Sequence, residues 1–371
     1  MYTLPEYRLR LFLSVDLVGS TAYKADQASQ AFAKVKPKWV ALFTDFYREF
    51  PERLASNFLS SGRFGEATVE EKHPPKIWKT IGDEIVLCSR VLSIEHLVHT
   101  VSCFVETMAE YSKVIQKTSD KLDLKGNAWV AACPAPNIAF PLVQSEFPEF
   151  QDLDTSEEIE LRIDEMPSRF DFLGKAIDTG FRISKNSKSE QMTVSVQLAY
   201  LLCRAEIEGK PTLSLEYGGR FELKGVNGGI PYPVIYINTE RSAVKKRLTA
   251  REKALVGSKT PEPQHMFDFL DDFMQHAKIE KPFISFRGVE LDAKDKPDSF
   301  KDFEQAFQGA IKEIARRDAN YLQAEATDLP RAAAQPEDEL EDIIERSEEL
   351  ATVRRGRSDD ADPVRGDTVE G

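Results

Sequence analysis

The sequence predicts an α+β fold whose core is a ferredoxin-like split βαβ arrangement, followed by a small C-terminal domain. Two observations predict it. Short apolar runs with strand character alternate with stretches that repeat apolar residues every three or four positions. Their order is strand, helix, strand, strand, helix, strand, then a further helix and a hairpin. We therefore expect a mixed sheet rich in antiparallel pairs, with helices on one face and the other face free to meet a partner.

The first strand and helix follow from the N-terminal residues. The segment RLRLFLSVD (8–16) is apolar and bounded by charge, which predicts a buried strand. The turn GST (19–21) follows, and Thr21 is placed to cap a helix that runs towards Phe50. Because Pro37 falls inside the apolar repeat of this helix, we expect a kink or a break there.

The middle of the sequence supplies the rest of the split βαβ core. KIWKTI, Gly82-Asp83 and EIVLC predict a strand, a tight turn and a second strand over 76–88. A helix over 91–117 and a strand over 124–133 follow. The polar stretch 60–75 and the Pro- and Glu-rich stretch 134–168 are predicted to be two irregular insertions.

The remaining elements complete the first domain and lead to a second. We expect a helix over 172–184, a strand over 192–196, a helix over 197–208 and a hairpin over 221–238. The predicted organisation is a catalytic domain at 1–240, a charged and Pro-rich linker at 241–263, a small helical domain at 264–328 and an acidic tail at 329–371. The tail has few large apolar residues, so we expect it to be disordered.

Charge and composition exclude several classes of protein. The net charge is −13, but residues 336–371 contain 13 acidic and 5 basic residues and so carry −8 of it. No basic footprint for nucleic acid is present. We find neither an apolar run of about 18 residues nor a signal-peptide core, so we expect a cytoplasmic protein without a membrane segment. The four cysteines are scattered and form no CxxC pair, which argues against a zinc site.

The end of the first strand is a candidate site for phosphate and metal. Asp16 ends an apolar strand and is followed by the turn Gly19-Ser20-Thr21 and a helix start. Backbone N–H groups at a helix start can face an anion, and glycine permits its close approach. Taken alone, Asp16 is more typical of a strand-end residue that caps a helix.

Asp83, at the tip of the predicted hairpin, favours a metal-binding role for Asp16 over a purely structural one. An Asp after Gly in a turn is usually structural. In a split βαβ fold, however, the first strand and this hairpin are adjacent, so that Asp16 and Asp83 meet. Two carboxylates that are close repel each other unless a divalent cation lies between them. Oxygen ligands alone favour Mg²⁺ or Mn²⁺.

Three motifs in this order resemble those of class III adenylyl and guanylyl cyclases. FLSVDLVGST resembles their first metal motif, KTIGDE their second, and DFLGKAIDTGFR the helix segment that supplies other active-site residues. The resemblance covers about residues 11–238, with two insertions. It implies a class III cyclase catalytic domain that converts a nucleoside triphosphate to the 3′,5′-cyclic monophosphate and pyrophosphate. It also implies two Mn²⁺ or Mg²⁺ ions per active site.

The resemblance assigns roles to single residues. The carboxylates of Asp16 and Asp83 and the carbonyl of Leu17 correspond to the metal ligands. Lys79 and Asp171 fall at the two base-selecting positions. Gly19, Ser20 and Thr21 form the phosphate-binding turn.

Two further positions lie on the last motif. Arg182 falls at the arginine that stabilises the transition state, where its guanidinium can meet growing negative charge. Without the motif it would be an ordinary surface arginine. Asp178 falls where the family usually has a ribose-orienting Asn, and an ionised carboxylate cannot donate as an amide does. Its role could be to accept from a ribose hydroxyl or to arrange Arg182. Lys224 lies near the family's triphosphate-binding lysine, but Val226 could hold that position instead.

In this family the metal aspartates come from one subunit, and the base, ribose and arginine positions from the other. The resemblance therefore implies a homodimer with shared active sites and an inactive monomer. On the same hairpin, Lys79 and Asp83 would then serve two different sites.

The base-selecting pair does not choose a base by itself. A lysine donor with an aspartate acceptor matches adenine, uracil, cytosine and guanine. The two insertions, the motif GKAIDTGFR and the C-terminal module resemble those of bacterial Pycsar pyrimidine cyclases. The module is similar to their AGS-C domain. This resemblance implies UTP as substrate and cyclic UMP as a second messenger in anti-phage defence, acting on a separate cyclic-nucleotide-activated effector protein.

Other functions stay open on the sequence alone. A cytidylate or adenylate cyclase would carry the same Lys and Asp pair. A catalytically inactive cyclase-like domain could act as a nucleotide sensor or dimerisation module, although both metal carboxylates and the arginine are present. A diguanylate cyclase or another palm enzyme shares the split βαβ core. Here, however, Gly82-Asp83-Glu84 follows Lys-Thr-Ile and not a glycine pair.

Overall fold

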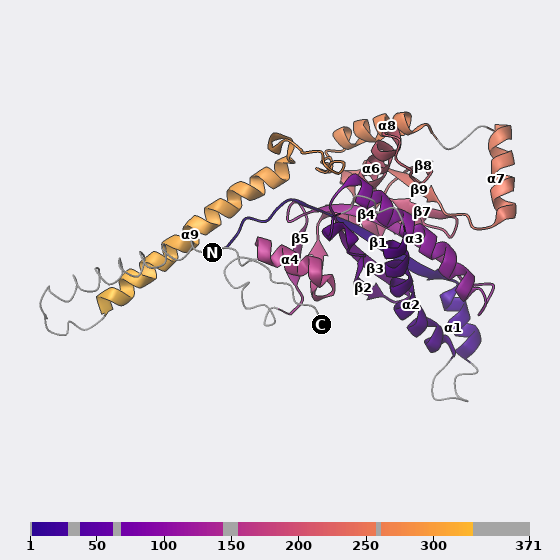
Figure 1. Cartoon of the computed structure of the whole chain (residues 1–371), viewed down its shortest axis with the longest axis horizontal. Coiled ribbons are helices and arrows are strands. Elements are labelled where there is room, and N and C mark those ends of the chain that lie inside the picture. The colour runs from indigo at the N-terminus through magenta and orange to yellow at the C-terminus, as the bar shows by residue number, and fades with distance from the viewer. Residues whose placement is uncertain (1, 29–37, 62–67, 144–154, 257–260, 329–371) are drawn as a thin grey trace, which may run out of the picture. The chain divides into compact units, whose positions relative to one another are not determined.

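A computed structural model describes residues 2–28, 38–61, 68–143, 155–256 and 261–328 (Figure 1). The chain divides into two compact units, 1–313 and 314–371. The strands are β1 (Arg8–Val18), β2 (Lys76–Ile81), β3 (Glu84–Val91), β4 (Asp123–Cys133), β5 (Ile138–Pro141), β6 (Phe170–Leu173), β7 (Gln191–Val194), β8 (Leu215–Phe221) and β9 (Tyr232–Asn238).

The helices are α1 (Ser20–Ala28), α2 (Lys38–Ser60), α3 (Ile94–Ile115), α4 (Glu157–Glu165), α5 (Lys175–Ile183), α6 (Val196–Ile207), α7 (Ala243–Val256), α8 (Pro263–His276) and α9 (Asp298–Asp328). Single 3₁₀ turns are η3 (Glu70–Lys72), η6 (Pro167–Arg169), η7 (Ser184–Asn186), η8 (Asn227–Gly229) and η9 (Ala293–Asp295). Helix α9 begins in the first unit and ends in the second. Among the described residues, no helix combines the length and apolar character needed to span a membrane.

The sheet confirms the predicted α+β fold with a split βαβ core. Seven strands lie in the order β2-β3-β1-β4-β7-β9-β8. The pairs β2–β3, β3–β1 and β1–β4 are antiparallel, as the ferredoxin-like arrangement requires. Strand β7 runs parallel to β4, and β9 and β8 add two antiparallel pairs. The sheet is therefore mixed and mainly antiparallel, and β1 lies between β3 and β4.

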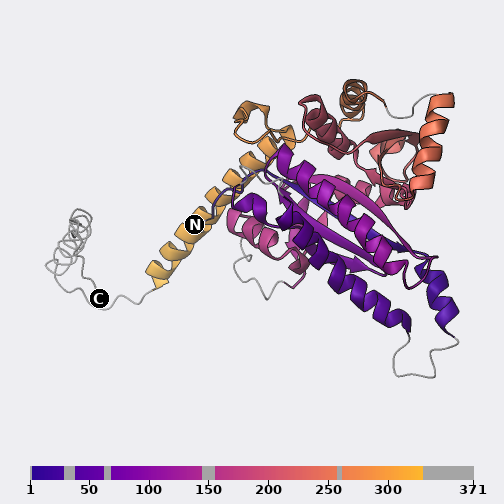
Figure 2. The same ribbon diagram turned by 45° about the vertical axis from the view of Figure 1, so that its right-hand side comes forward.

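One face of the sheet is covered by helices and forms the main apolar core. Leu11, Leu13 and Val15 of β1 are fully buried there against α2, α3, α6 and α8. Figures 1 and 2 show α2 and α3 lying side by side over this face. At Gly126 of β4 an added Cβ would lie 2.7 Å from Met108 Sδ, so the missing side chain lets α3 approach closely.

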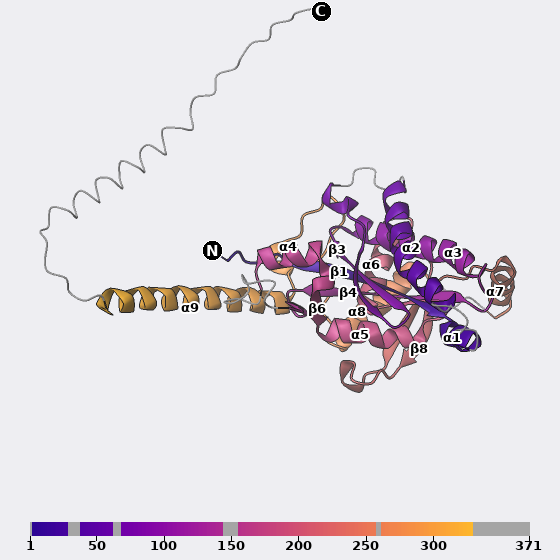
Figure 3. The same cartoon turned by 90° about the horizontal axis from the view of Figure 1, so that it is seen from below.

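The opposite face, which we expected to be free for a partner, carries a second apolar cluster around Phe12 and Trp129. The ring centroids of these two residues lie 5.3 Å apart in a stacked arrangement. The two-stranded sheet β5–β6, helix α4 and helix α5 cover this cluster. Seen from below, α5 lies on the other side of the sheet from α2 and α3 (Figure 3). This covering positions the residues of the third motif.

Two local predictions differ from the structure, and a third lies outside the described residues. Residues 172–184 are not one helix, because the end of β6 precedes α5 and Gly174, with φ 142°, separates them. The insertion 134–168, predicted to be irregular, contains β5 and α4. The kink or break expected at Pro37 lies outside the described residues, which contain helix α1 before it and helix α2 after it.

The C-terminal organisation is partly described. Helix α7 occupies much of the segment predicted as a linker, and α8 contributes Met266 and Leu270 to the main core. The domain boundaries at 240 and 264 stay predictions. The acidic tail predicted at 329–371 lies outside the described residues.

Candidate active site

Asp16 lies near the end of β1 with one neighbouring strand on each side. Its Cα partners are Glu84 on β3 and Lys125 on β4. The carboxylate points away from the core that holds Val15 and Leu17, because successive side chains of a strand alternate between faces. The Asp16 side chain is 23% exposed, and its Oδ2 lies 2.8 Å from Lys125 Nζ. Asp16 therefore presents a carboxylate at the sheet surface, beside the turn that starts α1.

That turn requires its glycine. Gly19 has φ +84°, and an added Cβ would lie 2.4 Å from the carbonyl oxygen of Lys121. Helix α1 begins at Ser20, two residues before Ala22, the first helical residue that the predicted Thr21 cap implies, and Tyr23 N donates to Gly19 O at 3.0 Å. The N–H groups of the first turn precede this bond and point out of the helix end. The geometry suits the predicted phosphate-binding turn.

Asp83 stands at the tip of the β2–β3 hairpin, and the turn brings it to the same end of β1. Ser20 Oγ donates a hydrogen bond to Asp83 Oδ2. Tyr47 of α2 donates its hydroxyl to Gly82 O and so holds the tip from the other side. The predicted adjacency of the first strand and the hairpin is confirmed, since β3 pairs with β1 as far as Glu84 and Asp16. We call Asp16, Asp83 and Ser20 the metal-side cluster.

The carboxyl group of Glu84 lies close to the metal-side cluster, and its pKa is affected by the charges there. Burial raises the pKa of Glu84, and the negative charges of Asp16 and Asp83 raise it further. A hydrogen bond from Ser14 Oγ and the charge of Lys125 act in the opposite direction. Asp16 and Asp83 therefore both lie close enough to Glu84 to act on the pKa of its carboxyl group.

The donor set of the metal-side cluster fits a hard divalent cation. In the described part of the chain, no three His, Cys, Asp or Glu side chains are arranged to hold a metal ion together. The predicted set uses two carboxylates and the carbonyl of Leu17, which leaves positions for phosphate oxygens and water. Mg²⁺ is typically bound in this way, through one or two carboxylates and the substrate phosphates.

Lys125 is a residue of this site that sequence reasoning missed. Together with Asp16, Glu84 and Ser184 it lines a small pocket of about 40 Å³. Its ammonium group balances Asp16 at the position where a cation is predicted to bind. Only the register of β1 against β4 places Lys125 there, and the sequence around it, DLKGN, carries no separate signal.

Lys79 and Asp171 are brought together from distant parts of the sequence. Lys79 Nζ of β2 lies 2.5 Å from Asp171 Oδ1 of β6, and both side chains are about 30% exposed. Asp171 Oδ1 also accepts from the N–H of Phe172 at 3.0 Å. The ammonium group lies 4.0 Å from the centre of the Trp78 ring. We call Lys79 and Asp171 the base-side pair; their role in selecting a base stays a prediction.

Helix α5 carries Asp178 and Arg182, one turn apart. Gly180 fixes its position, because an added Cβ would lie 2.2 Å from the Trp129 ring of β4. Asn127 Nδ2 also donates to Gly180 O at 2.9 Å. Asp178 is exposed, and Arg182 is half-buried with its guanidinium beside Gly225. The loop that contains Lys224 thus lies next to the predicted transition-state arginine.

Comparison with known proteins gives likeness at the level of structure. No protein-family model matches the sequence, and no curated protein matches it. Among solved structures, the adenylyl cyclase CyaB from P. aeruginosa matches with a TM-score of 0.42 at 11% identity over 64% of this chain and 97% of that one.

Two further solved structures illustrate the range. The guanylate cyclase domain of RhGC from Catenaria anguillulae, in complex with GTP, matches with a TM-score of 0.40 at 14% identity over 64% of this chain and all of that one. A bacterial light-regulated adenylyl cyclase matches with a TM-score of 0.40 at 9% identity over 72% of this chain and 58% of that one. At such identities the likeness concerns the fold, so function is argued from the site.

Proposed function

We propose that the protein is a metal-dependent nucleotidyl cyclase. The observation that carries the proposal is the metal-side cluster, in which Asp16, Asp83 and the start of helix α1 lie at the same end of β1. A helix N-terminus is suited to bind phosphate, and paired carboxylates are suited to hold the cations that accompany a triphosphate. Lys79 and Asp171, the proposed donor and acceptor for a base, form an ion pair on the same chain.

The proposed reaction closes a ring within one nucleotide. The 3′-oxygen bonds to the α-phosphorus, the bond from that phosphorus to the bridging oxygen breaks, and pyrophosphate leaves while the hydroxyl proton passes to solvent. Divalent cations bound to Asp16, Asp83 and the Leu17 carbonyl would acidify the 3′-hydroxyl and neutralise the triphosphate. The turn at 19–21 binds phosphate oxygens, and Arg182 donates to the charge that develops during the transfer.

Each active site is proposed to form between two copies of the chain. The metal-side cluster of one subunit would face the base-side pair, Asp178 and Arg182 of the other, as the resemblance to class III cyclases implies. A mixture of Asp16→Ala and Arg182→Ala proteins should then regain part of the activity, since one of the two sites in a mixed dimer is intact. No recovery after demonstrated subunit exchange would contradict shared sites.

We propose UTP as the preferred substrate and cyclic UMP as the product. The support is the resemblance of the motifs and insertions to Pycsar pyrimidine cyclases, because the base-side pair alone fits several bases. On the same ground we propose a role in anti-phage defence through a separate effector, with residues 264–328 as an AGS-C-like module. The neighbours of known structure named above are adenylyl and guanylate cyclases.

One experiment tests activity and base preference together. The full-length protein is incubated with ATP, GTP, CTP and UTP in the presence of Mn²⁺, and the products are identified by mass. We expect cyclic UMP as the main product and none from an Asp83→Asn variant. A clear preference for ATP would overturn the pyrimidine proposal alone. Absence of a cyclic product from all four nucleotides, with folded dimeric protein, would overturn the cyclase proposal.

A further inference from the structure

The segment that carries Asp171 is held along its length by one edge strand. Strand β2 is the first strand of the seven-stranded sheet, so its only strand partner in that sheet is β3. Lys76 Nζ donates to the carbonyl oxygens of Asp164 and Glu165 at 3.2 and 2.9 Å. Trp78 Nε1 donates to Phe170 O at 3.0 Å. The ion pair between Lys79 and Asp171 follows, so three side chains of β2 hold 164–171 at successive points.

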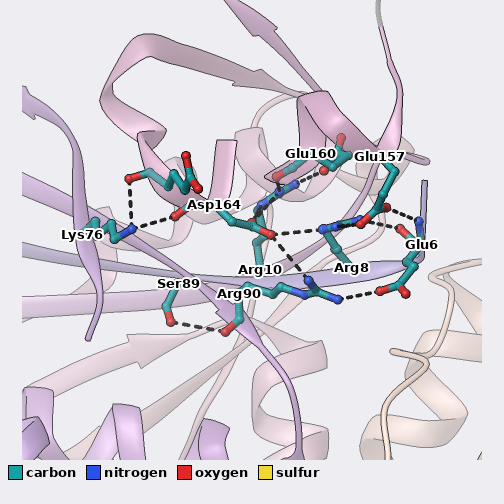
Figure 4. A network of polar contacts seen from close by, with 10 residues as sticks. Glu6, Arg8, Arg10, Lys76, Ser89, Arg90, Glu157, Glu160 and Asp164 are labelled. Carbon is teal, nitrogen blue, oxygen red and sulfur yellow. Dashed lines mark hydrogen bonds and ion pairs between the residues drawn. The ribbon is translucent and has the colours of Figure 1, made fainter. Parts of the chain in front are cut away.

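The start of this segment is fixed by buried arginines. Arg10 Nη1 lies 2.6 Å from Glu160 Oε2, and its Nη2 lies 2.7 Å from Asp164 Oδ1. Arg8 Nε lies 3.1 Å from Asp164 Oδ2 and also pairs with Glu157. Both arginine side chains are fully buried. Figure 4 shows these groups and Lys76 converging on one side of helix α4.

Asp164 is the centre of the network. Arg8 and Arg10 of β1 bond its two oxygens, and Arg90 Nη1 of β3 lies 3.8 Å from Oδ2. Arginine binds carboxylates through several N–H groups in a fixed plane, so the position of Asp164 is strongly determined. Buried ion pairs add little net stability compared with well-packed apolar groups. The network is therefore better suited to fixing a position than to stabilising the fold.

We propose that Lys76 and Asp164 are positioning residues that set the geometry of the base-side pair. Asp164 anchors the end of α4 to β1, and Lys76 ties the same point to β2, three residues before Lys79. The intervening chain to Asp171 is short and passes through the 3₁₀ turn η6. The identity of the accepted base then depends on residues that do not touch the nucleotide. This inference rests on the proposed cyclase function.

Lys76→Met is the sharpest variant, because Lys76 is exposed and the change keeps an unbranched side chain while removing the donor. Lys76→Arg keeps a cationic donor and should restore wild-type behaviour. Lys72→Met, an exposed lysine in η3 outside this network, is the matched control. For Lys76→Met we expect about a tenfold rise in KM for the preferred nucleotide, the effect of losing charge-assisted hydrogen bonds.

The pattern of kinetic change separates positioning from a general structural role. In Lys76→Met, kcat should stay within about twofold, and the Mn²⁺ concentration for half-maximal activity should not change, because the metal-side cluster is untouched. The ratio of kcat/KM for the best nucleotide to kcat/KM for the second-best nucleotide should fall towards one. A fall in kcat together with a changed Mn²⁺ response would overturn the proposal, as would kinetics identical to Lys72→Met.

Hydrogen exchange of the Trp78 indole N–H gives a readout that does not need activity. Its NMR signal, assigned with Trp78→Phe, should exchange faster in Lys76→Met than in wild type or Lys72→Met, since the bond to Phe170 O is loosened. Unchanged exchange in Lys76→Met would overturn the positioning role. Exchange could also be faster in Lys76→Met while the wild-type protein makes no cyclic nucleotide. The contacts by which β2 holds residues 164–171 would then be supported. That outcome would overturn the cyclase proposal and, with it, the link to base selection.

Discussion

The two faces of strand β1 differ in the kind of contact that their side chains make. Towards the helices, the side chains of alternate residues are apolar and pack into one continuous core; they are Leu9, Leu11, Leu13, Val15 and Leu17. On the other face most side chains are polar, and nearly every one has a specific partner. Along the strand, Arg8 and Arg10 form ion pairs with helix α4, and Phe12 packs in an aromatic cluster. Ser14 then bonds Glu84, and Asp16 pairs with Lys125.

This difference predicts which substitutions within one strand act on stability and which act on activity. An apolar face accepts many side chains of similar volume, since packing is not tied to single donors and acceptors. A face of paired charges is tied to particular atoms, because an unpaired buried charge is costly. We therefore expect substitutions on the helix-covered face to change mainly the free energy of unfolding, and substitution of the partly exposed Asp16 on the opposite face to change mainly activity. The four predictions below test this division.

The largest effect is expected at Asp16. Asp16→Asn keeps the shape of the side chain but removes the charge proposed to hold a cation, so kcat should fall by on the order of 10³-fold. Because the ion pair with Lys125 is partly exposed, the free energy of unfolding should change by less than about 1 kcal/mol. Steady-state kinetics and urea unfolding check both values. Asp26→Asn, on the surface of α1, is the control.

On the helix-covered face, Phe104→Ala should give the reverse result. Phe104 of α3 is fully buried and contacts Phe50. Its truncation should lower the free energy of unfolding by about 3–5 kcal/mol. Activity per folded molecule should stay within about twofold, while Leu59→Ala, at a side chain 56% exposed, should change neither quantity. A large loss of activity in folded Phe104→Ala protein would break the division between the faces.

His96 makes the stability of the helix-covered side depend on pH. Burial lowers its pKa to about 4 from the usual value of 6.5. The unfolded state therefore binds more protons between these values, and stability is lost as pH falls from 6.5 towards 4. From pH 7 to pH 5 this group should cost about 2 kcal/mol of unfolding free energy. Urea titrations of wild type and His96→Gln measure it; equal pH dependence in both would refute the assignment.

The smallest effect is expected at Lys125. Its ammonium group pairs with Asp16 and would compete with the proposed cation, so Lys125→Met should lower the Mn²⁺ concentration for half-maximal activity. Because both groups are partly exposed, we expect a change of only about three- to fivefold. Lys121→Met, which removes a surface ion pair with Asp26, is the control. A higher Mn²⁺ requirement in Lys125→Met would show that Lys125 supports the metal-side cluster.

Much of the fold was predictable because its signals are local. The apolar run that forms β1, the Gly-Asp turn of the hairpin and the order of elements were enough to predict the split βαβ core and the meeting of β1 with the hairpin tip. The candidate roles of Asp16, Asp83, Lys79, Asp171 and Arg182 came from motif resemblance. They stay predictions until activity is measured.

What the sequence did not predict depends on contacts between distant segments. Helix α4 is acidic, and its partners are Arg8 and Arg10, about 150 positions away, so its own periodicity gave little indication. The sequence predicts a helix from Phe172, inside strand β6, because the pairing of β6 with β5 is not visible in FDFL. Lys125 became a site residue only through strand register. In each case the missing information was tertiary.

The β2–β3 hairpin has a mechanical consequence for the proposed dimer. It is a short hairpin that carries Lys79 on one strand and Asp83 at its tip, and hydrogen bonds from Tyr47 and Ser20 hold the tip. If its two ends belong to different active sites, nucleotide bound at one site moves or stiffens a part of the other. Saturation curves should then be sigmoidal or biphasic, with Hill coefficients that depart from one and return to it when Tyr47 is replaced by Phe.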